Sequence, residues 1–424
     1  PLKVAPVPPL MTAWGCISGI LKSCPSYPGK AGVGHVELKE NTPRKVSFDT
    51  ADPEEKPIWD NCIQRASSLT STASAWSEAA SLGRWTSDDS DSEDKHSTPE
   101  YATIAPDVTL AASCCFSRPL QIRVCSWNLN GSDILDADNI TPWLCMGHWT
   151  DILVVGVQEL VELKPSKVVS FEEGDPKRMA LLEKQMEHTM ASASGSFVKV
   201  CSVGLAGLAM FVYVREELAP CVRQVCKDRV KTGFGGLIAN KGGVCARLTV
   251  GNTTACFMNV HLPAGTGKAA KRNRHLRMIM SKAFRWRPGN SALWPSFERA
   301  QMEHDFTVIF GDLNSRPDRE VDERRGAKLI GARLEDDELL RGRLPILRNF
   351  SEGPISFPPT FRYIPGTDNF SPRSSPAWCD RVVFRADAST EVDLLEYDSL
   401  HKLRNTSDHR PVAAQFQVLP PSTC

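Results

Sequence analysis

Six short segments of this 424-residue chain place polar or charged side chains beside apolar stretches. The segments are residues 127–131, 158–159, 259–261, 311–314, 379–381 and 407–411. One such residue alone is usually a turn or a cap, but an ordered set that leaves the strands of a sheet at one edge predicts a shared cleft. The set contains carboxylates, amides and imidazoles. Metal-assisted phosphoryl hydrolysis needs these groups, because they bind Mg²⁺, activate water and stabilise phosphoryl oxygens.

The apolar stretches between these residues predict a large α/β domain. Residues 121–125 and 151–157 have the pattern of buried strands, and the second is apolar on consecutive positions, as in a strand covered on both faces. Further strands are predicted at residues 197–203, 208–214, 244–250, 254–260, 306–310, 381–384 and 412–418. Apolar side chains at helical spacing predict helices over residues 177–190 and 269–284. Strands interleaved with a few helices indicate packed sheets.

The amino-terminal part of the chain has a different composition. Residues 1–115 carry 10 Lys and Arg against 15 Asp and Glu, whereas residues 116–424 carry 40 against 35, so the net charge of zero is the sum of −5 and +5. Residues 1–115 lack sustained periodicity and include the Ser/Asp run SDDSDSED, which predicts a disordered acidic leader before a folded domain at residues 116–420. A neutral chain is also a poor candidate for wrapping nucleic acid.

The cysteine pattern predicts a reducing compartment. Fourteen cysteines are scattered along the chain without a CxxC pair. No apolar stretch of about 18 residues predicts a membrane-spanning helix, and the start of the chain lacks the basic and apolar regions of a signal peptide. We therefore expect a cytoplasmic protein.

The ordered motifs resemble those of the inositol polyphosphate 5-phosphatases, within the superfamily that shares the DNase I-type fold. The resemblance runs from about residue 121 to residue 418. The stretches WNLNG, QEL, NVHL, GDLN and SDHRPV are shared in looser form with endonucleases and sphingomyelinases, whereas NKGGV, GDLNSR, PTFRY and PAWCDR discriminate the 5-phosphatases. The resemblance implies a four-layer α/β sandwich of two packed mixed β-sheets flanked by helices, and it identifies residues 116–420 as the catalytic domain.

The resemblance also implies a metal and a nucleophile site. Glu159 matches the family's Mg²⁺ ligand, and Asn128 lies beside it and helps to hold the metal. Asp312 matches the carboxylate that orients and deprotonates water, and Asn314 matches the amide that steadies the phosphate. The implied reaction is in-line attack of water on phosphorus without a covalent enzyme intermediate.

Two histidines complete the catalytic set that the resemblance implies. His409 matches the imidazole at the scissile phosphate, and Asp380 is expected to bind its other ring nitrogen, which sets the tautomer and raises the basicity. His261 matches a second histidine that stabilises the transition-state oxygens, and Asp408 is expected near the metal and the nucleophile.

Substrate recognition requires cations around the other ring phosphates. Lys241 follows Asn240 in NKGG, which is predicted to be a loop whose glycines let the backbone approach a phosphate closely. The resemblance implies that Arg362 and Arg381 hold the 4-phosphate, with Tyr363 beside them. Lysine is commoner than arginine at position 362 in the family, and the arginine fork changes the donor geometry.

Three positions depart from the family pattern. Gly265 stands where a second histidine usually follows His261 by four residues, Ser315 stands where an aromatic usually follows GDxN, and Ala239 replaces a glycine. None of these changes removes a proposed metal ligand or the water-activating carboxylate. They bear on substrate orientation and rate.

The sequence therefore predicts an enzyme that removes the 5-phosphate from phosphoinositides such as phosphatidylinositol 4,5-bisphosphate, or from soluble inositol polyphosphates. A nuclease or sphingomyelinase on the same fold is the alternative within the superfamily. A different alternative is a scaffold that recruits protein phosphatase 1, because Arg44–Phe48 (RKVSF) resembles its docking motif, with Val46 and Phe48 as anchors. The basic run at residues 268–277 is either a patch for transient contact with the cytosolic face of a membrane or a solvated helix face.

Overall fold

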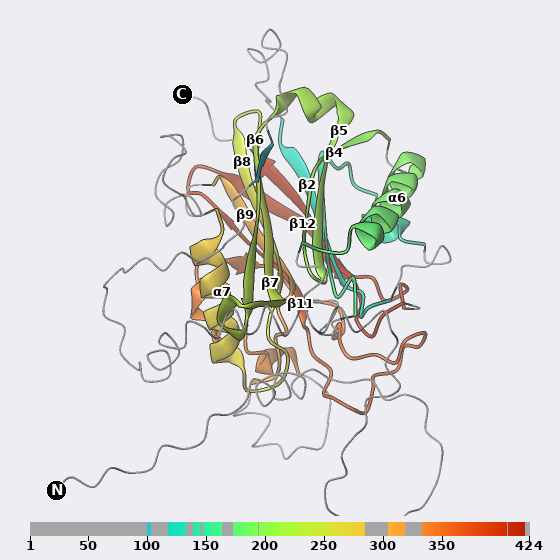
Figure 1. The fold of residues 1–424 in the computed structure, drawn as a ribbon, viewed down its shortest axis with the longest axis vertical. Helices are drawn as coiled ribbons and strands as arrows, with labels where there is room; N and C mark the ends of the chain where they lie inside the picture. Colours follow the sequence, from blue (N-terminus) through green and yellow to red (C-terminus); the bar gives the residue numbers. More distant parts are fainter. Residues whose placement is uncertain are drawn as a thin grey trace, which may run out of the picture. The chain divides into compact units, whose positions relative to one another are not determined.

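The computed structural model describes residues 100–102, 118–132, 139–144, 147–162, 173–193, 195–284, 304–318, 333–404 and 406–419. All of them lie in one compact unit, residues 93–424. Two β-sheets pack against each other in this unit, and helices cover their outer faces (Figure 1). Within the described residues, no helix is long and apolar enough to cross a membrane.

Sheet A contains seven strands in the order β1-β6-β7-β8-β9-β11-β10. Their bounds are β1 Glu100–Ala102, β6 Val222–Gly233, β7 Ile238–Val250, β8 Thr253–His261, β9 Phe306–Asp312, β11 Asp380–Ala386 and β10 Ser351–Glu352. Strands β8 and β9 are parallel, and the other neighbours are antiparallel. Strand β9 is buried along its whole length, and its neighbours β8 and β11 fix its position in the sheet.

Sheet B contains six strands in the order β12-β13-β2-β3-β5-β4. Their bounds are β12 Glu391–Ser399, β13 Val412–Leu419, β2 Leu120–Asn128, β3 Ile152–Gln158, β5 Leu208–Arg215 and β4 Phe197–Leu205. Strands β2 and β3 form the parallel pair of this sheet. Every residue of β3 is buried, as the consecutive apolar pattern predicts for a strand covered on both faces.

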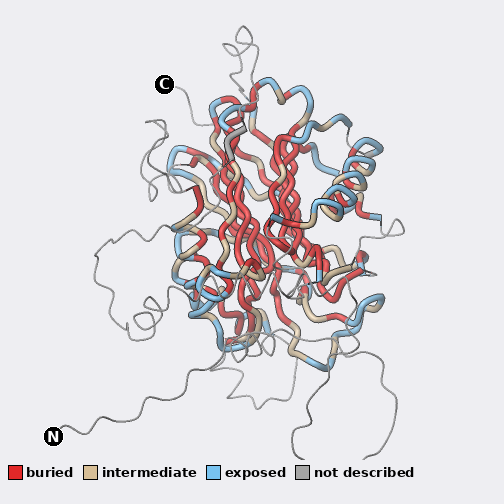
Figure 2. The backbone as a smooth tube through the Cα atoms, viewed as in Figure 1, coloured by how far each residue is buried: buried red, intermediate tan, exposed pale blue. Residues whose placement is uncertain are grey.

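Three apolar clusters hold the layers together. The largest fills the space between the sheets and includes Val154, Phe257 and Phe310. The second packs α4 (Thr141–Leu144) and α6 (Pro176–Ala193) on sheet B, and the third packs α7 (Ala269–Lys282) on sheet A. Figure 2 shows that the strands of both sheets are the most buried part of the backbone. The predicted four-layer sandwich of two mixed sheets flanked by helices is confirmed.

A buried polar link joins the two sheets below the ends of β3 and β8. Gln158 donates from Nε2 to Oδ1 of Asn259 at 2.6 Å, and Asn259 donates from Nδ2 to the carbonyl oxygen of Ala209 at 2.9 Å. A Cβ on Gly156 would lie 2.5 Å from Cε2 of Phe310, so only glycine permits this close approach of the sheets. The link therefore holds the two strand ends in one register.

The predicted strands and both predicted helices are present, with bounds that differ by a few residues. Strand β6 and strand β12 were not predicted. In β12 most side chains are exposed or half-buried, so the strand lacks the apolar pattern of a core strand. Strand β1 lies inside the segment predicted to be a disordered leader and pairs with β6. The rest of residues 1–117, including Val46 and Phe48, lies outside the described residues.

Candidate active site

The sheet register brings the predicted catalytic residues to one end of the sandwich. In sheet A, Asp312 at the end of β9 is paired with His261 of β8 on one side and with Asp380 of β11 on the other. In sheet B, Asn128 at the end of β2 is paired with Gln158 of β3. Because β2 with β3 and β8 with β9 are parallel, their carboxyl ends open on the same side. The side chains converge there, as the sequence predicts.

Asp312 lies at the centre of this group. Its Oδ2 accepts a hydrogen bond from Nδ2 of Asn128 at 3.0 Å and lies 3.2 Å from Nε2 of His261. Its Oδ1 accepts from the backbone N–H of Asn314 at 2.9 Å. Lys241 contacts His261 through Nζ and Nε2. The carboxylate is buried, so these contacts fix its orientation.

The charge of Asp312 is stabilised by its neighbours. Burial alone would raise the pKa of Asp312, but the hydrogen bond from His261 and the positive charges of His261, His409 and Lys241 outweigh burial and hold the pKa below its ordinary value. Asp312 is therefore ionised at neutral pH, and its fixed oxygens can accept hydrogen bonds.

A second buried pair joins β11 to the segment before β13. Nδ1 of His409 lies 2.8 Å from Oδ2 of Asp380, and Thr360 donates from Oγ1 to the same oxygen at 2.7 Å. The ring of Phe361 lies 4.5 Å from the imidazole ring. The backbone N–H of His409 donates to Oγ of Ser407 at 3.1 Å. These contacts leave Nε2 of His409 as the nitrogen that faces a reacting group.

The carboxylates around His409 set its protonation. Burial alone would lower the pKa of His409, but the charge and hydrogen bond of Asp380, together with the charges of Asp312 and Asp408, raise the pKa to about 9. Burial also raises the pKa of Asp380, an effect that the positive charge of His409 opposes. The pair is therefore an imidazolium bound to a carboxylate, and it can donate a hydrogen bond to an anionic oxygen.

Glu159 and Asn128 fit a magnesium ion by the chemistry of their donors. Within the described part of the chain, the carboxylate of Glu159 accepts no hydrogen bond, and its charged neighbour within 4 Å is Nε2 of His261, at 3.6 Å. The described residues contain no group of three or more His, Cys, Asp and Glu side chains arranged to hold a metal together. Mg²⁺ commonly takes one or two protein oxygens and completes its shell with water and substrate oxygens, which agrees with this donor set.

Three residues of the site have positive φ angles without being glycine. They are Glu159 at 49°, Asn130 at 52° and Asn314 at 52°. Such backbone is costly for residues with a Cβ, and it concentrates at functional sites. The carbonyl oxygen of Glu159 accepts a hydrogen bond from the backbone N–H of Gly131 at 2.7 Å, which helps to hold this conformation. The strained backbone aims the Glu159 and Asn314 side chains.

Arg362 lies where a substrate cation is expected, but it is paired. Its Nε lies 3.1 Å from Oδ2 of Asp408, and its side chain keeps 17% of its exposure. Burial raises the pKa of Asp408, and the charge of Glu159 raises it further, while His409 and Arg362 lower it. Arg362 can therefore reach solvent and neutralise Asp408 at the same time.

Arg381 is in a different place from the expected one. Its side chain is fully buried, Nε donates to Oε1 of Glu352 at 2.6 Å, Nη1 donates to Oδ1 of Asp337 at 2.9 Å, and Nη2 contacts the other oxygen of Glu352. All three nitrogens are occupied by the carboxylates of Asp337, which is buried, and Glu352, which is half-buried. Instead of facing a 4-phosphate, Arg381 joins β11 to β10 and to the segment around Asp337.

Tyr363 and the NKGG glycines also serve the fold. The hydroxyl of Tyr363 donates to the carbonyl oxygen of Pro359 at 2.8 Å, and the guanidinium of Arg410 lies 3.8 Å from the centre of its ring. NKGG is part of strand β7 and not a loop. A Cβ on Gly242 would lie 2.2 Å from the carbonyl oxygen of Val230, and one on Gly243 would lie 2.9 Å from Ile279. Gly242 is therefore needed for packing against β6, and Gly243 for packing against α7.

Three further residues act on the site without having been assigned a role from the sequence. Arg316 donates from Nη2 to Oδ1 of Asn314 at 2.6 Å, Thr360 binds Asp380, and Ser407 binds the carbonyl oxygen of Asn128 at 2.5 Å. Each of the three lies in a motif that carries the resemblance. Their place in these motifs is the sequence feature that could have identified them as site residues. The departure Ser315 is buried and donates to Oδ2 of Asp337 at 2.8 Å.

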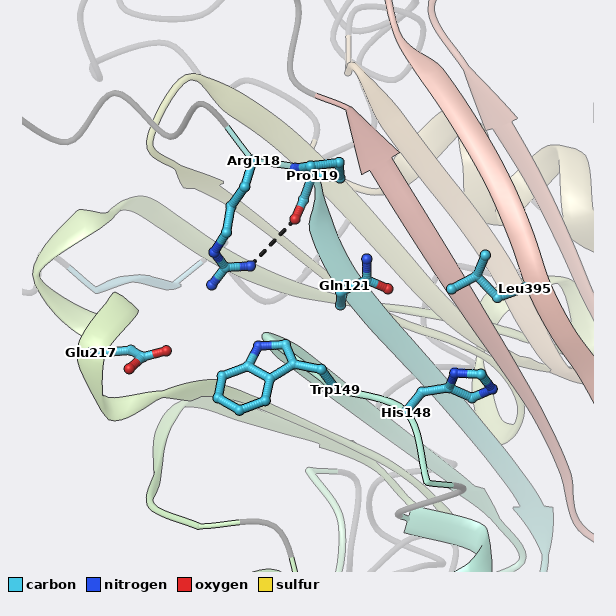
Figure 3. A pocket seen from close by; sticks show the side chains of 7 residues that line it. All are labelled: Arg118, Pro119, Gln121, His148, Trp149, Glu217 and Leu395. Atoms are coloured by element: carbon cyan, nitrogen blue, oxygen red, sulfur yellow. Dashed lines mark hydrogen bonds between the residues drawn. The ribbon is translucent and has the colours of Figure 1, made fainter.

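A separate pocket of about 670 Å³ lies at the start of β2 and before β3 (Figure 3). Its lining includes Arg118 and Trp149, which both donate to the buried carboxylate of Asp151, at 2.7 and 2.9 Å. The catalytic candidates follow the far ends of these strands. Eight residues of strand span about 26 Å, so this pocket is distinct from the candidate active site.

Comparison with known proteins gives consistent matches. A family model described as Endonuclease/Exonuclease/phosphatase family 2 matches residues 125–415. Human synaptojanin-1 is 30% identical over 358 residues, which cover 72% of this chain and 22% of the relative. Mouse phosphatidylinositol 4,5-bisphosphate 5-phosphatase A is 28% identical over 372 residues, which cover 80% and 35%. The chain thus spans about a fifth to a third of the length of these curated relatives.

Solved structures agree with these matches. The inositol polyphosphate 5-phosphatase domain of SPsynaptojanin, solved with inositol (1,4)-bisphosphate and a calcium ion, is 30% identical, with a TM-score of 0.56 over 71% of this chain and 84% of that chain. Cimex nitrophorin, at 20% identity and a TM-score of 0.51 over 71% of this chain and 99% of that chain, shares the fold alone.

Proposed function

The chain belongs to the inositol polyphosphate 5-phosphatase family, and on that premise we propose that it hydrolyses the 5-phosphate of phosphoinositides or of soluble inositol polyphosphates. The placement of Asp312 between His261 and Asn128, beside the His409–Asp380 pair, carries the proposal. It combines an ionised water acceptor with cationic donors for phosphoryl oxygens. The proposed cofactor is Mg²⁺, held by Glu159 and Asn128, which when bound supplies charge stabilisation for the phosphoryl group.

In the proposed reaction, Asp312 orients a water molecule and accepts its proton as the water attacks phosphorus in line with the leaving ring oxygen. His409 donates from Nε2 to a phosphoryl oxygen, and Asp380 keeps the imidazolium oriented. His261 and Lys241 stabilise the remaining negative charge, Asn314 steadies the phosphate, and Arg362 takes the neighbouring 4-phosphate. The leaving ring oxygen takes up a proton from solvent and Asp312 returns its proton to solvent, so the products are the free ring hydroxyl and inorganic phosphate.

The geometry disfavours a covalent cysteine mechanism. Cys379 and Arg385 have the Cys-x5-Arg spacing of covalent phosphatases. Cys379, however, is fully buried, and Arg385 lies in strand β11 rather than at the end of a phosphate-binding loop. Burial raises the pKa of the Cys379 thiol, and a thiol nucleophile needs the opposite shift.

We also propose transient contact with the cytosolic face of a membrane. The hairpin between β6 and β7 ends in the turn η3 (Phe234–Gly236), and Phe234 and Leu237 at its tip are 49% and 53% exposed. The cations Lys271 and Arg274 of helix α7 lie in the basic run that the sequence singles out. Helix α7 packs on strand β6 of this hairpin through His275 and Thr232, and an apolar hairpin tip on the element that holds a basic helix suits an anionic lipid surface. A vesicle sedimentation assay with Phe234→Ser/Leu237→Ser tests this, with Leu181→Ser on α6 as control.

The full chain is tested against a panel of soluble and liposomal inositides, with abasic DNA and sphingomyelin alongside. We expect phosphate release from the inositides in the presence of Mg²⁺ and none from the other two substrates. Asp312→Ala and His409→Ala are expected to abolish release, and Asp387→Ala at the protein surface to preserve it. Full activity in both catalytic variants would reject the mechanism.

Docking of protein phosphatase 1 through Val46 and Phe48 remains a separate proposal, because these residues lie outside the described part of the chain. Its test is capture of the phosphatase by the wild-type chain and by Val46→Ala/Phe48→Ala. Equal capture by both chains, or capture by neither, would reject it.

A further inference from the structure

Gly265 leaves space beside the active site that a lysine occupies. It follows His261 by four residues, at the position where the resembled family usually has a second histidine, and its φ is +100°. A Cβ built on Gly265 would lie 3.2 Å from Nζ of Lys268 and 3.4 Å from Cε of the same side chain. The ammonium of Lys268 thus lies directly against the place where the side chain of residue 265 would begin.

The loop that carries Gly265 is held in place by a buried arginine. Nη1 of Arg272 donates to the carbonyl oxygens of Pro263 at 2.7 Å and of Gly265 at 2.9 Å. The other side of the guanidinium binds the carboxylate of Glu338. The loop after His261 therefore has a fixed path, and the space beside Gly265 is a stable feature of the site.

Lys268 is exposed to solvent, and its ammonium has no carboxylate partner among the described residues. Lys271, Arg272 and Arg316, in contrast, are close enough to act on it. Burial lowers the pKa of Lys268, and these three cations lower it further. Arg272 is matched by the nearby carboxylate of Glu338. Within the described residues, however, Lys268, Lys271 and Arg316 form no salt bridge, and cations without matching acids favour an anion.

Arg316 joins this group of cations to the catalytic residues and has an unused donor. It is 7% exposed, its Nη2 binds Oδ1 of Asn314 at 2.6 Å, and its guanidinium lies 4.4 Å from the centre of the Phe361 ring. Its Nε is buried and has no hydrogen-bond partner among the described residues. A buried N–H without an acceptor is unfavourable, so this nitrogen is a second, independent sign of an anionic ligand.

We propose that Lys268, in the space left by Gly265 and beside Arg316, binds a phosphate of the substrate other than the 5-phosphate, which is hydrolysed, and the 4-phosphate, which Arg362 takes. The inference rests on the proposed function, and it makes Lys268 a residue that determines specificity. The ligand is a ring phosphate monoester of a soluble inositol polyphosphate or the phosphodiester of a lipid headgroup. A flexible ammonium suits either, because it acts as a point charge without a required planar geometry.

The test compares the wild-type chain with Lys268→Gln on inositol 4,5-bisphosphate, 1,4,5-trisphosphate and 1,3,4,5-tetrakisphosphate. We expect kcat/KM to fall about tenfold, which is about 1.4 kcal/mol, only when the substrate carries the 1- or the 3-phosphate. A loss that is already present with the trisphosphate identifies the 1-phosphate as the bound group. A loss that is present only with the tetrakisphosphate identifies the 3-phosphate. Lys268→Arg, which keeps the charge, is expected to recover most of the loss.

Two controls separate a bound phosphate from a general charge effect. Lys282→Gln removes a positive charge from the last turn of the same helix and is expected to change none of the three substrates. Vesicles with the lipid substrate in neutral or anionic carrier lipid separate the headgroup from the membrane surface. A loss in Lys268→Gln that is equal for all three substrates, or that follows the carrier lipid alone, would overturn the proposal.

Calorimetric binding of the same compounds in EDTA, where turnover does not occur, gives a readout that is independent of catalysis. We expect Lys268→Gln to weaken binding of the trisphosphate or the tetrakisphosphate by a similar factor. If the wild-type chain hydrolyses no inositide, the proposed function fails. Unchanged binding in Lys268→Gln would then reject the role of Lys268 separately.

Discussion

Nε of Arg362 lies 3.1 Å from Oδ2 of Asp408, so the cation expected to bind substrate is already paired with a carboxylate of the catalytic group. Asp408 is nearly buried, with 8% of its side chain exposed, and Arg362 is more accessible, at 17%. A phosphate that binds Arg362 would compete with Asp408 for the guanidinium. Binding of a substrate phosphate to Arg362 would therefore also change the charge environment of Asp408.

Replacing Arg362 tests this contact. We expect Arg362→Met to lower kcat/KM on substrates with a 4-phosphate by about 10- to 100-fold, because a charge-assisted hydrogen bond contributes about 1.5–3 kcal/mol. Arg362→Lys should lose less, since it keeps the charge but not the fork. The measurement is kcat/KM on inositides with and without the 4-phosphate. An equal loss on both would show that Arg362 acts through Asp408 alone.

Asp380 is expected to control the pH range of activity. The folded pKa of His409 is raised to about 9, so the imidazolium is present at neutral pH and is lost as the pH rises through 9. In Asp380→Asn the pKa of His409 should fall, and the alkaline decline of kcat/KM should move to lower pH. The pH profile of both proteins checks this. An unchanged profile would remove His409 from the role of cationic donor.

Glu159 is expected to set the metal requirement. Removal of divalent ions with EDTA should abolish phosphate release, and added Mg²⁺ should restore it. Glu159→Gln keeps the shape of the side chain but removes its charge, so the Mg²⁺ concentration for half-maximal activity should rise about 10-fold or more. A titration of activity against Mg²⁺ measures this. Equal Mg²⁺ requirements in both proteins would argue for a different ligand.

Arg381 is expected to contribute to stability rather than to substrate affinity. Arg381→Met leaves the carboxylates of Glu352 and Asp337 without their partner, which typically costs about 3–5 kcal/mol. Denaturant unfolding should show this loss in Arg381→Met, and Arg362→Met provides the comparison at a half-buried position. Normal stability combined with a raised KM for the 4-phosphate would instead restore the role expected from the sequence.

His275 is expected to make stability depend on pH. Burial, with the charges of Lys271, Arg274 and Lys241, lowers the folded pKa of His275 to about 4, and its Nδ1 lies 2.8 Å from Oγ1 of Thr232. The ordinary value is about 6.5, so the stabilisation is complete above pH 6.5 and is lost as the pH falls toward 4. Between pH 7 and 5 the free energy of unfolding should drop by about 1–2 kcal/mol.

His275→Gln is the matched variant for this prediction. It cannot be protonated, so its stability should change less over the same pH interval. Urea unfolding of both proteins at pH 7 and pH 5 gives the comparison. Parallel changes in the two proteins would assign the pH dependence to other groups.

Much of the fold could be predicted from local patterns. Strands β3 and β9 are apolar on consecutive positions, because both faces of the strand are covered. The order of strands and polar motifs also allowed the mixed two-sheet sandwich to be expected by resemblance. Strand β12 could not be predicted, because at the edge of sheet B most of its side chains remain accessible and no apolar pattern is required.

The sequence by itself determined which chemical groups are available and in which order they follow the strands. Asp312, His261 and His409 could be predicted as site residues because each stands beside an apolar strand segment in a recognisable motif. Arg362 and Arg381 were both expected to bind the 4-phosphate, and only the tertiary structure decided which partners each of them meets. Arg362 faces Asp408 near solvent, whereas Arg381 faces Glu352 and Asp337 inside the protein.

The physical reason is that the partner of an arginine is set by distant parts of the chain. Glu352 and Asp337 precede Arg381 by 29 and 44 residues. Glu352 reaches Arg381 through the pairing of β10 with β11, and Asp337 lies in a separate segment that pairs with Pro317. The same applies to Gly265 and Lys268, since the loop path between them depends on Arg272 and Glu338. Residue type determines what a side chain can bind, and packing determines which of those partners it meets.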